Sequence, residues 1–486
     1  MSSRREELAG RVQIPDSFEA LPLSDTIDVD GSSARGYVVA RPRISGGYTW
    51  GGPMRASFAK KAALVASATA MAVTLAACSS SSSTTTTTTS GTTGGGSAKG
   101  NGAPLKIALV ASLTGEDAAL NADSPKGFTA RVDAQNAAGG INGHKIDPII
   151  IDDQTSPTQV VVAVQQAISD GVVGIVSNTP LMFEAAKYAQ QAGIPVTGGS
   201  FDGSEWGTQP NTNMFPSDAI NTDPKVPWSK ATGAFLKAHG GTNVATYGYG
   251  ISPSSTHGTY AVASSAQAAG LKVGVMDVSV QFGSESFGTQ ALAAKSAGAN
   301  ALTAQMDVNS NLALLAALNQ NGVHPKVVDF PTGYGSSLVN SNVWATAQGV
   351  YFATSFRPWN IPLNAGTTTM QASFRKYAGF TASQFPDFGQ NETYTGADLM
   401  ITGLLKAGAN PTPASTIKAL RSITAYNADG ILPVTLDYST NFGYNTMQSC
   451  GWYEQAQKTA FKAISSTPEC YPVIPGSSSL TAPKLH

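Results

Sequence analysis

Two blocks of alternating apolar runs and helical repeats fill the chain from about residue 105 onward. The run Leu105–Ala111 is continuously apolar apart from Lys106, which is typical of a strand buried on both faces. Ser124-Pro125 and Ser156-Pro157 each provide a helix cap followed by proline at the first helical position. Alternation of strands and helices of this length indicates βαβ units and a parallel sheet. In this block we predict strands at 105–111, 146–151, 172–176 and 194–197, and helices at 124–138, 156–168 and 183–191.

The alternation resumes after a break at residues 222–227. The two blocks are of similar size, so they predict two lobes rather than one large sheet. Open α/β sheets bind ligands at the carboxyl ends of their strands, and here those ends would face each other across a cleft. In the second block we predict strands at 244–249, 272–280, 300–305, 326–330, 349–354 and 432–438, and helices at 256–269, 289–297, 312–320, 368–377, 394–407 and 413–421.

An export signal precedes the first block. Arg55, Lys60 and Lys61 form a positive flank, and residues 62–77 are uncharged and rich in Ala, Val, Leu and Met. This run is shorter than the roughly 20 residues that span a bilayer as a helix. It ends in Leu75-Ala76-Ala77-Cys78, which resembles a bacterial lipobox, the signal in which the cysteine is lipidated and becomes the new N-terminus. The alternative is a buried alanine-rich helix that ends in cysteine.

The residues around this signal divide the N-terminal part of the chain. Residues 1–53 carry six of the eleven arginines and show no apolar periodicity, so we predict that translation starts at Met54 and that 1–53 are not part of the mature protein. Residues 54–77 are then a lipoprotein signal peptide. Residues 78–104 are almost entirely Ser, Thr and Gly, which cannot bury a core, and we predict a flexible tether to the membrane.

Composition limits the remaining possibilities. A formal net charge of −1 with 13% charged residues argues against nucleic acid as a partner. Apart from Cys78, the cysteines are Cys450 and Cys470, and disulfides persist outside the cytoplasm, so we predict a Cys450–Cys470 bridge; two free thiols are the alternative. No CxxC occurs and the five histidines are scattered, so we predict no metal site and no cofactor.

Several motifs carry a family resemblance. They are Leu105–Val110 with Leu113-Thr114-Gly115, the run Asn-Ala-Ala-Gly-Gly-Ile-Asn-Gly at 136–143, Asp152-Asp153-Gln154, Ala192–Val196 and the loop from Tyr249 to Gly258. In this order they resemble the leucine/isoleucine/valine-binding protein family, the type I periplasmic solute-binding proteins of ABC importers. The resemblance covers about residues 105–470.

The resemblance implies a protein that performs no chemistry. Two Rossmann-like lobes would close around a small solute and present it to the permease and ATPase subunits of an ABC importer. Three crossover segments would join the lobes, near 221–225, 354–359 and 430–434. Lobe one would comprise 105–222 plus 358–431, lobe two 223–357 plus 432–475, and 476–486 would form a flexible tail.

The resemblance also implies where a ligand binds in lobe one. The family holds a ligand carboxylate there with hydroxyls and backbone N–H groups at a helix N-terminus, which favours anions. The matching positions here are Ser177, Asn178 and Thr179, followed by Ser200 and Phe201. The alternative is that these residues are ordinary helix caps and turns. Asp202 stands where the family often has threonine.

Lobe two departs from the family pattern. Amino-acid binders of the family place acidic residues near two positions that hold an ammonium group, and the matching residues here, Asn221 and Thr332, are uncharged. Asp218, Asp307 and Glu205 are possible substitutes, and Asp307 is the best of them because it follows a predicted strand end. The residues of lobe two that we expect at the ligand are Tyr249, His257, Asp307, Thr332 and Tyr334. This set suits a small amphipathic solute, namely an amino acid or a related carboxylate or amide.

Two other functions remain as alternatives. A ligand-sensing receptor component could share this fold. A secreted hydrolase is less consistent with the sequence, which contains no Gly-x-Ser-x-Gly elbow, no His-Glu-x-x-His and no P-loop.

Overall fold

The computed structural model describes residues 102–199, 203–207, 211–218, 227–284, 286–440, 448–478 and 481–485, with the backbone alone for Ser204 and Gln448. The predicted signal peptide, Cys78 and almost all of the tether lie outside these residues. So do Ser200, Phe201, Asp202 and Asn221. All described residues belong to one compact unit, Gly91–His486.

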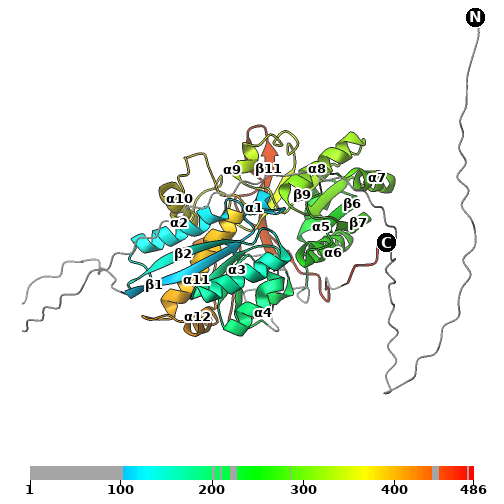
Figure 1. Cartoon of the computed structure of the whole chain (residues 1–486). Helices are drawn as coiled ribbons and strands as arrows, with labels where there is room; N and C mark the ends of the chain where they lie inside the picture. Colours follow the sequence, from blue (N-terminus) through cyan, green and yellow to red (C-terminus); the bar gives the residue numbers. More distant parts are fainter. Residues whose placement is uncertain are drawn as a thin grey trace, which may run out of the picture. The chain divides into compact units, whose positions relative to one another are not determined.

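The first lobe is built on a five-stranded sheet in the order β2-β1-β3-β4-β5, and all of its strand pairs are parallel (Figure 1). Its predicted strands form because their apolar residues are buried on both faces of the sheet. The strands are β1 (Gly102–Ala111), β2 (His144–Asp152), β3 (Gly174–Asn178), β4 (Val196–Gly198) and β5 (Met214–Pro216).

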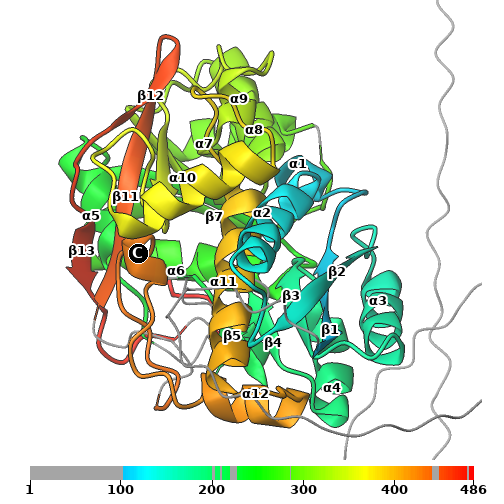
Figure 2. The ribbon, with the colours of Figure 1, turned by 90° about the vertical axis from the view of Figure 1, so that its left-hand side faces the viewer.

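Helices cover both faces of this sheet. On one face α3 (Pro157–Ser169) and α4 (Met182–Ala192) pack over Ala108 and Val110 of β1. On the other face α2 (Ser124–Ala137) and α11 (Phe388–Lys406) pack over Ile107 and Leu109. Figure 2 shows α11 lying alongside α2, although the two helices are far apart in sequence. The helices α10 (Ala365–Tyr377) and α12 (Pro413–Leu420) pack against α2 and α11, respectively.

The second lobe is built on an eight-stranded mixed sheet. Its path is β12-β11-β10-β9-β8-β6-β7, with β13 paired to β11. Strands β6 to β10 are parallel, whereas β11 runs antiparallel to β10. The strands are β6 (Asn243–Tyr249), β7 (Lys272–Val280), β8 (Ala301–Gln305), β9 (Val327–Phe330), β10 (Tyr351–Thr354), β11 (Gln448–Gln457), β12 (Ala460–Ala463) and β13 (Glu469–Pro472).

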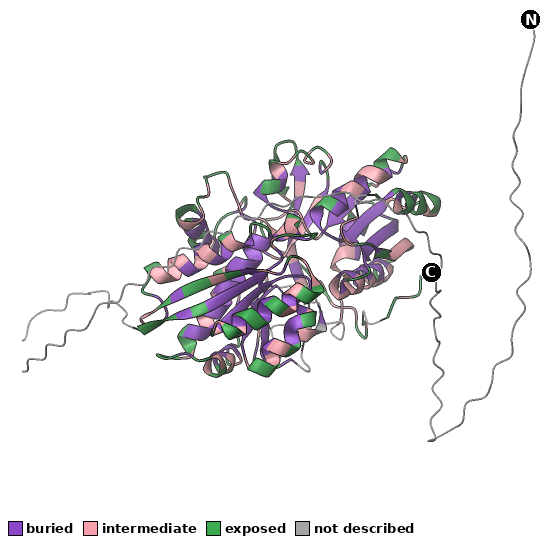
Figure 3. Cartoon of the chain, in the orientation of Figure 1, coloured by how far each residue is buried: buried purple, intermediate pink, exposed green. Residues whose placement is uncertain are grey.

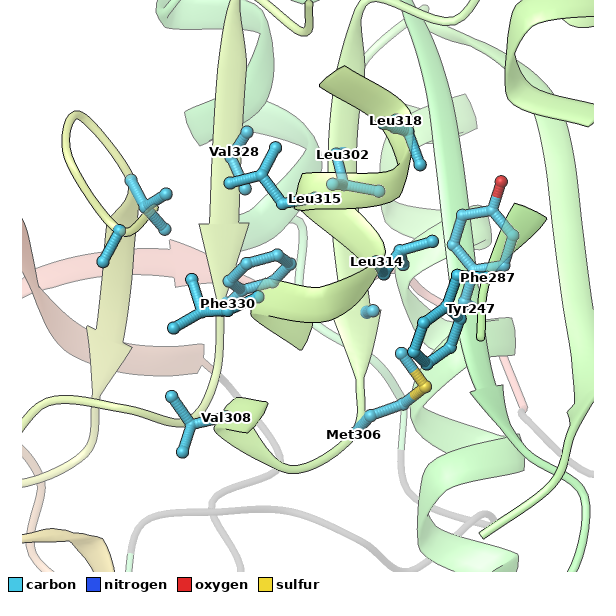
Figure 4. Close-up of a cluster of buried hydrophobic side chains, with 14 of the residues drawn as sticks. Tyr247, Phe287, Leu302, Met306, Val308, Leu314, Leu315, Leu318, Val328 and Phe330 are labelled. Atoms are coloured by element: carbon cyan, nitrogen blue, oxygen red, sulfur yellow. The ribbon is translucent and has the colours of Figure 1, made fainter. Parts of the chain in front are cut away.

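Helices again sandwich the sheet. On one face α5 (Ala231–Ala238) and α6 (Pro253–Ala268) cover strand residues such as Val244 and Val327. On the other face α7 (Gly288–Ala297) and α8 (Val308–Gln320) cover a larger apolar cluster, part of which is drawn in Figure 4 around Leu302, Leu314 and Phe330. The burial colours of Figure 3 place both cores along the strands, with exposed residues on the outer faces of the helices. Short helical turns complete the described structure: α1 (Ala118–Asn121), α9 (Ser336–Val339), η1 (Ser204–Trp206) and η2 (Ala428–Gly430).

Two predictions about the C-terminal third are wrong. Residues 432–438 form no strand beyond a single bridge between Tyr426 and Leu436. Their alternating apolar side chains pack instead with α10, α11 and α12, and Leu432, Leu436 and Tyr438 are buried there. The second sheet is also not wholly parallel, because β11, β12 and β13 add antiparallel pairs.

The helix predicted at 394–407 begins six residues earlier, at Phe388. Asp387 and Gln390 form a reciprocal capping box, which satisfies backbone donors at a polar helix start. None of the helices in the described ranges is long and apolar enough to cross a bilayer.

Candidate ligand-binding site

A cavity of about 360 Å³ lies between the two sheets, at the carboxyl ends of their parallel strands. From the first lobe, Asp117 follows β1, Pro180 follows β3 and Asp218 follows β5. From the second lobe, Asp307 follows β8 and Thr332 follows β9. This is the edge at which open α/β sheets bind ligands, and the volume fits a small metabolite.

The charged residues that line the cavity are all acidic. They are Asp117, Asp218, Asp307, Asp329 and Glu469, and no Lys, Arg or His is among the described lining residues. A cavity of this charge disfavours an anion unless a cation accompanies it, and it favours a ligand that carries a positive group.

Asp117 is held in the wall of the first lobe by a chain of side-chain amides. Its Oδ2 accepts a hydrogen bond of 2.5 Å from Asn121 Nδ2, and Asn121 Oδ1 in turn accepts one of 2.7 Å from Asn178 Nδ2. Asp117 is only 4% exposed. Burial, and then the nearby charges of Asp307 and Asp153, raise the pKa of the Asp117 carboxyl well above its usual range.

Asp307 faces the same cavity from the second lobe. It caps the N-terminus of α8, since its Oδ1 accepts the backbone N–H groups of Asn309 and Ser310 at 2.9 and 3.1 Å. Its Oδ2 accepts a hydrogen bond from the hydroxyl group of Tyr249, another lining residue. These three donors fix the carboxylate rigidly in place.

Two indole groups beside the cavity have buried N–H donors without an acceptor in the described residues. Trp228 and Trp452 both line it, and neither Nε1–H finds a hydrogen-bond acceptor within the described part of the chain. A buried donor without a partner carries a desolvation cost of about 1–3 kcal/mol. A ligand acceptor, such as a carboxylate or carbonyl oxygen, would remove that cost.

The predicted residues of the first lobe lie one layer behind the cavity. Ser177, Asn178 and Thr179 are fully buried and do not line it, although the next residue, Pro180, does. Asn178 Nδ2 also donates to Ser124 Oγ at 2.6 Å, and Thr179 Oγ1 accepts from the Leu181 N–H at 3.2 Å. These residues position α1 and the loop that follows β3. Asn178 is linked to the cavity wall by its hydrogen bond to Asn121, which in turn donates to Asp117.

The predicted residues of the second lobe divide into two groups. Tyr249, Asp307 and Thr332 line the cavity. His257 is half-buried on α6 and does not line it; burial lowers the pKa of its imidazole. Tyr334 lies in the apolar core beside Phe385 and Phe461 and lines a separate hollow of about 200 Å³. Its hydroxyl oxygen accepts the backbone N–H of Trp359 at 3.1 Å.

Sequence reasoning missed most of the acidic wall. Asp117 lies in the polar loop after the first strand, two residues past Leu113-Thr114-Gly115, where its sequence neighbours give no sign that it is buried. Asp329 is a carboxylate inside an otherwise apolar predicted strand, which is itself a signal. Asp218 was considered only as a replacement for an expected residue. Trp228, Trp452 and Glu469 carry no local signal, because they reach the cavity only through the fold.

The predicted disulfide is present and belongs to the cavity wall. It joins Cys450 of β11 to Cys470 of β13, directly opposite each other in the strand pair with Cα atoms 4.1 Å apart. Cys450 and its neighbours Ser449 and Gly451 line the cavity. The bridge therefore fixes the strands that form this side of the site.

Solved structures with the same fold bind different ligands. A leucine-binding protein LivK from Thermotoga maritima aligns with a TM-score of 0.62 at 15% identity, over 76% of this chain and 99% of that protein. A solute-binding protein of an ABC transporter from R. palustris, in complex with benzoate, aligns at 0.63 and 14% identity, over 77% and 99%. A fatty acid ABC transporter substrate-binding protein from Thermomonospora curvata aligns at 0.60 and 16%, over 75% and 92%.

Sequence comparison gives the family. A segment of 78 residues is 40% identical to Leu/Ile/Val-binding protein homolog 3 of Brucella melitensis biotype 1; it covers 15% of this chain and 21% of that protein. The family described as periplasmic binding protein matches residues 104–458, nearly all of the two lobes. The predicted resemblance and fold class are thereby confirmed. The chain belongs to the periplasmic binding protein family, whose members bind solutes and are not enzymes.

Proposed function

We propose that this protein captures a small amphipathic solute that carries an ammonium group and delivers it to an ABC importer. The acidic wall of the cavity is the observation that carries this proposal: five carboxyl groups and no basic side chain among the described lining residues. The indole N–H groups of Trp228 and Trp452 are suited to an acceptor on the same solute. An amino acid has both groups.

Asp117 and Asp307 suggest how the ligand drives closure. They belong to opposite lobes, and their carboxyl groups lie close enough for the charge of one to raise the pKa of the other. Bringing the lobes together without a cation therefore costs electrostatic free energy. An ammonium group between the two carboxylates attracts both, so the electrostatic free energy then favours closure. Such a ligand binds the closed form better than the open form. Closure then depends on the ligand.

This proposal refines the expectation from sequence. At the two positions where the family holds a ligand ammonium group, this chain has the uncharged Asn221 and Thr332. In the proposed site the carboxyl groups of Asp117 and Asp307 pair with that ammonium group instead. A related carboxylate or amide without an ammonium group is expected to bind more weakly. A role for Ser200 and Phe201 in holding a ligand carboxylate stays a prediction.

We further propose that the protein is a lipoprotein on the extracytoplasmic face of the cell membrane. The lipobox-like Leu75-Ala76-Ala77-Cys78 and the Ser/Thr/Gly segment after it support a lipid anchor on Cys78 with a flexible tether. Permease and ATPase subunits are the partners expected for the family.

Leucine and three analogues that keep its isobutyl group test the charge requirement. Thermal melting of the purified protein is measured with leucine, 3-methylbutylamine, 4-methylpentanoate and 4-methylpentanamide. Leucine and the amine should raise the melting temperature, because a ligand at a hundredfold excess over its Kd stabilises the native state by about 2.7 kcal/mol. A shift with the acid or the amide but not with either amine would contradict an ammonium site.

A further inference from the structure

The cavity continues from the space between the lobes into the second lobe, where its walls are different. This part, which we call the recess, lies between α5 and α6 on one side and the sheet on the other. The residues that define it are Ala261 and Ser265 of α6, Thr303 of β8, Asp329 of β9, Ala353 of β10 and Tyr453 of β11. Asp329 lies one residue and Thr303 two residues before the end of its strand, so the recess reaches below the carboxyl edge of the sheet.

Small side chains leave this space open. Ala261 stands where α6 faces the strands, and Ala353 stands on the opposing strand β10. Next to the recess the same two layers close around large apolar residues, among them Phe235, Leu236 and Val327. The recess is therefore a local gap in a packed interface, with mostly apolar walls.

Asp329 is the unusual member of this wall. It is 3% exposed, and its Oδ1 has no hydrogen-bond partner within the described residues. The backbone N–H of Ala353 donates to the same carboxyl group. The described residues that line the cavity include no Lys, Arg or His that could pair with this carboxyl group. A carboxyl oxygen buried without a partner costs stability, and asparagine could accept the Ala353 N–H equally well, so the acidic residue has no structural benefit here that asparagine would lack.

We propose that the recess is a second subsite, which takes the far end of an elongated solute and binds a terminal amino group there through Asp329. The proposal rests on the proposed function, because the near end of that solute carries the ammonium group held between Asp117 and Asp307. The solute class is thus a diamino compound with an apolar middle. The apolar walls of the recess contact the methylene groups, and the acidic residues at its two ends select the two amino groups.

Calorimetric titration of the full chain tests this proposal. The ligands are 1,6-diaminohexane, n-hexylamine and 3-methylbutylamine. The wild-type protein should bind the diamine about tenfold more tightly than hexylamine, the usual effect of one hydrogen bond to a charged group. Asp329→Asn should remove this preference for the diamine over hexylamine.

A space-filling variant separates the recess from the cleft. Ala261→Leu should weaken the diamine about tenfold or more and leave 3-methylbutylamine within about twofold, since the short amine does not enter the recess. Ala268→Leu is the matched control, because it makes the same change at an exposed position of the same helix. Thermal melting of each variant verifies that it is folded.

The outcomes distinguish this inference from the proposed function. Equal binding of diamine and hexylamine by the wild-type protein, or an unchanged preference in Asp329→Asn, would overturn the second subsite and leave the ammonium site intact. Binding of 4-methylpentanoate with no binding of any amine would overturn the ammonium site and the second subsite together.

Discussion

The residues that matter most to this site are buried acids, and their burial is a tertiary property. Asp307 could be predicted because it directly follows a recognisable strand end. Asp117 lies in a polar loop that local sequence cannot distinguish from a solvated turn. Asn178 was expected at the ligand, and in the structure its amide reaches Asp117 through Asn121. The sequence thus predicts which residues follow a strand end, but it does not predict how far each of their side chains lies from the cavity.

Asp117→Asn tests the wall of the first lobe. The amide keeps the size of the side chain but cannot pair with an ammonium group, so the affinity for 3-methylbutylamine should fall about tenfold. The melting temperature should not fall, because burial and the charges of Asp307 and Asp153 already disfavour the ionised form of this carboxyl group. Asp147→Asn, on an exposed part of β2, is the control and should bind like the wild-type protein. Unchanged affinity in Asp117→Asn would exclude this carboxyl group from the site.

At the scale of elements, the first lobe was predicted well and the end of the second lobe poorly. The early strands are continuous apolar runs, and their helices begin at Ser-Pro pairs such as Ser156-Pro157, so periodicity and caps agree. Strand β11 mixes polar and aromatic residues and pairs antiparallel, which gives no simple period. Residues 432–438 alternate like a strand, yet they follow the helices of the first lobe as an irregular segment. The alternation there reflects packing and not a sheet.

The disulfide between β11 and β13 gives a prediction at this scale. Its cysteines are separated by 20 residues, for which the chain-entropy model predicts a stabilisation of about 3 kcal/mol. The double variant Cys450→Ala/Cys470→Ala should therefore unfold at a lower urea concentration than the oxidised protein. Its ligand affinity should also fall, because both strands form the cavity wall. Reducing agent should lower the urea midpoint of the wild-type protein and leave that of the variant unchanged. Equal unfolding curves for the oxidised wild-type protein and the variant would contradict the prediction.

At the scale of the whole molecule, buried carboxyl groups set the dependence of stability on pH. Burial raises the pKa of Asp329 and of Glu454 to about 7 and that of Asp387 to about 6. The pKa values of Asp117, Asp153 and Glu392 are also raised, mainly by burial. Each group binds its proton more tightly in the folded than in the unfolded protein, so its contribution to stability is complete below about pH 4 and is lost as pH rises through its folded-state pKa, which is about 6 for Asp387 and about 7 for Asp329 and Glu454.

The free energy of unfolding should accordingly be larger at pH 5 than at pH 8. Among the described carboxyl groups with a shifted pKa, only Asp152 and Asp437 have a lowered one. These two groups make the protein less stable as the pH falls, but only below about pH 4. Urea unfolding at pH 5, 6.5 and 8 measures the effect. Asp329→Asn/Glu454→Gln should flatten the pH profile. A protein that becomes more stable between pH 5 and pH 8 would show that these carboxyl groups are ionised at little cost.

The packing of α11 also has a consequence for biosynthesis. The second face of the first sheet is covered by this helix, and Arg131 of α2 pairs with Asp398 of α11 at 2.7 Å, 267 residues further along the chain. While the ribosome is still making the second lobe, α2 is the main cover that this face of the sheet has, and the part that α11 buries stays open. The lobe that begins first along the chain is therefore completed only after the second lobe has been made, and until then its nascent chain is incompletely folded.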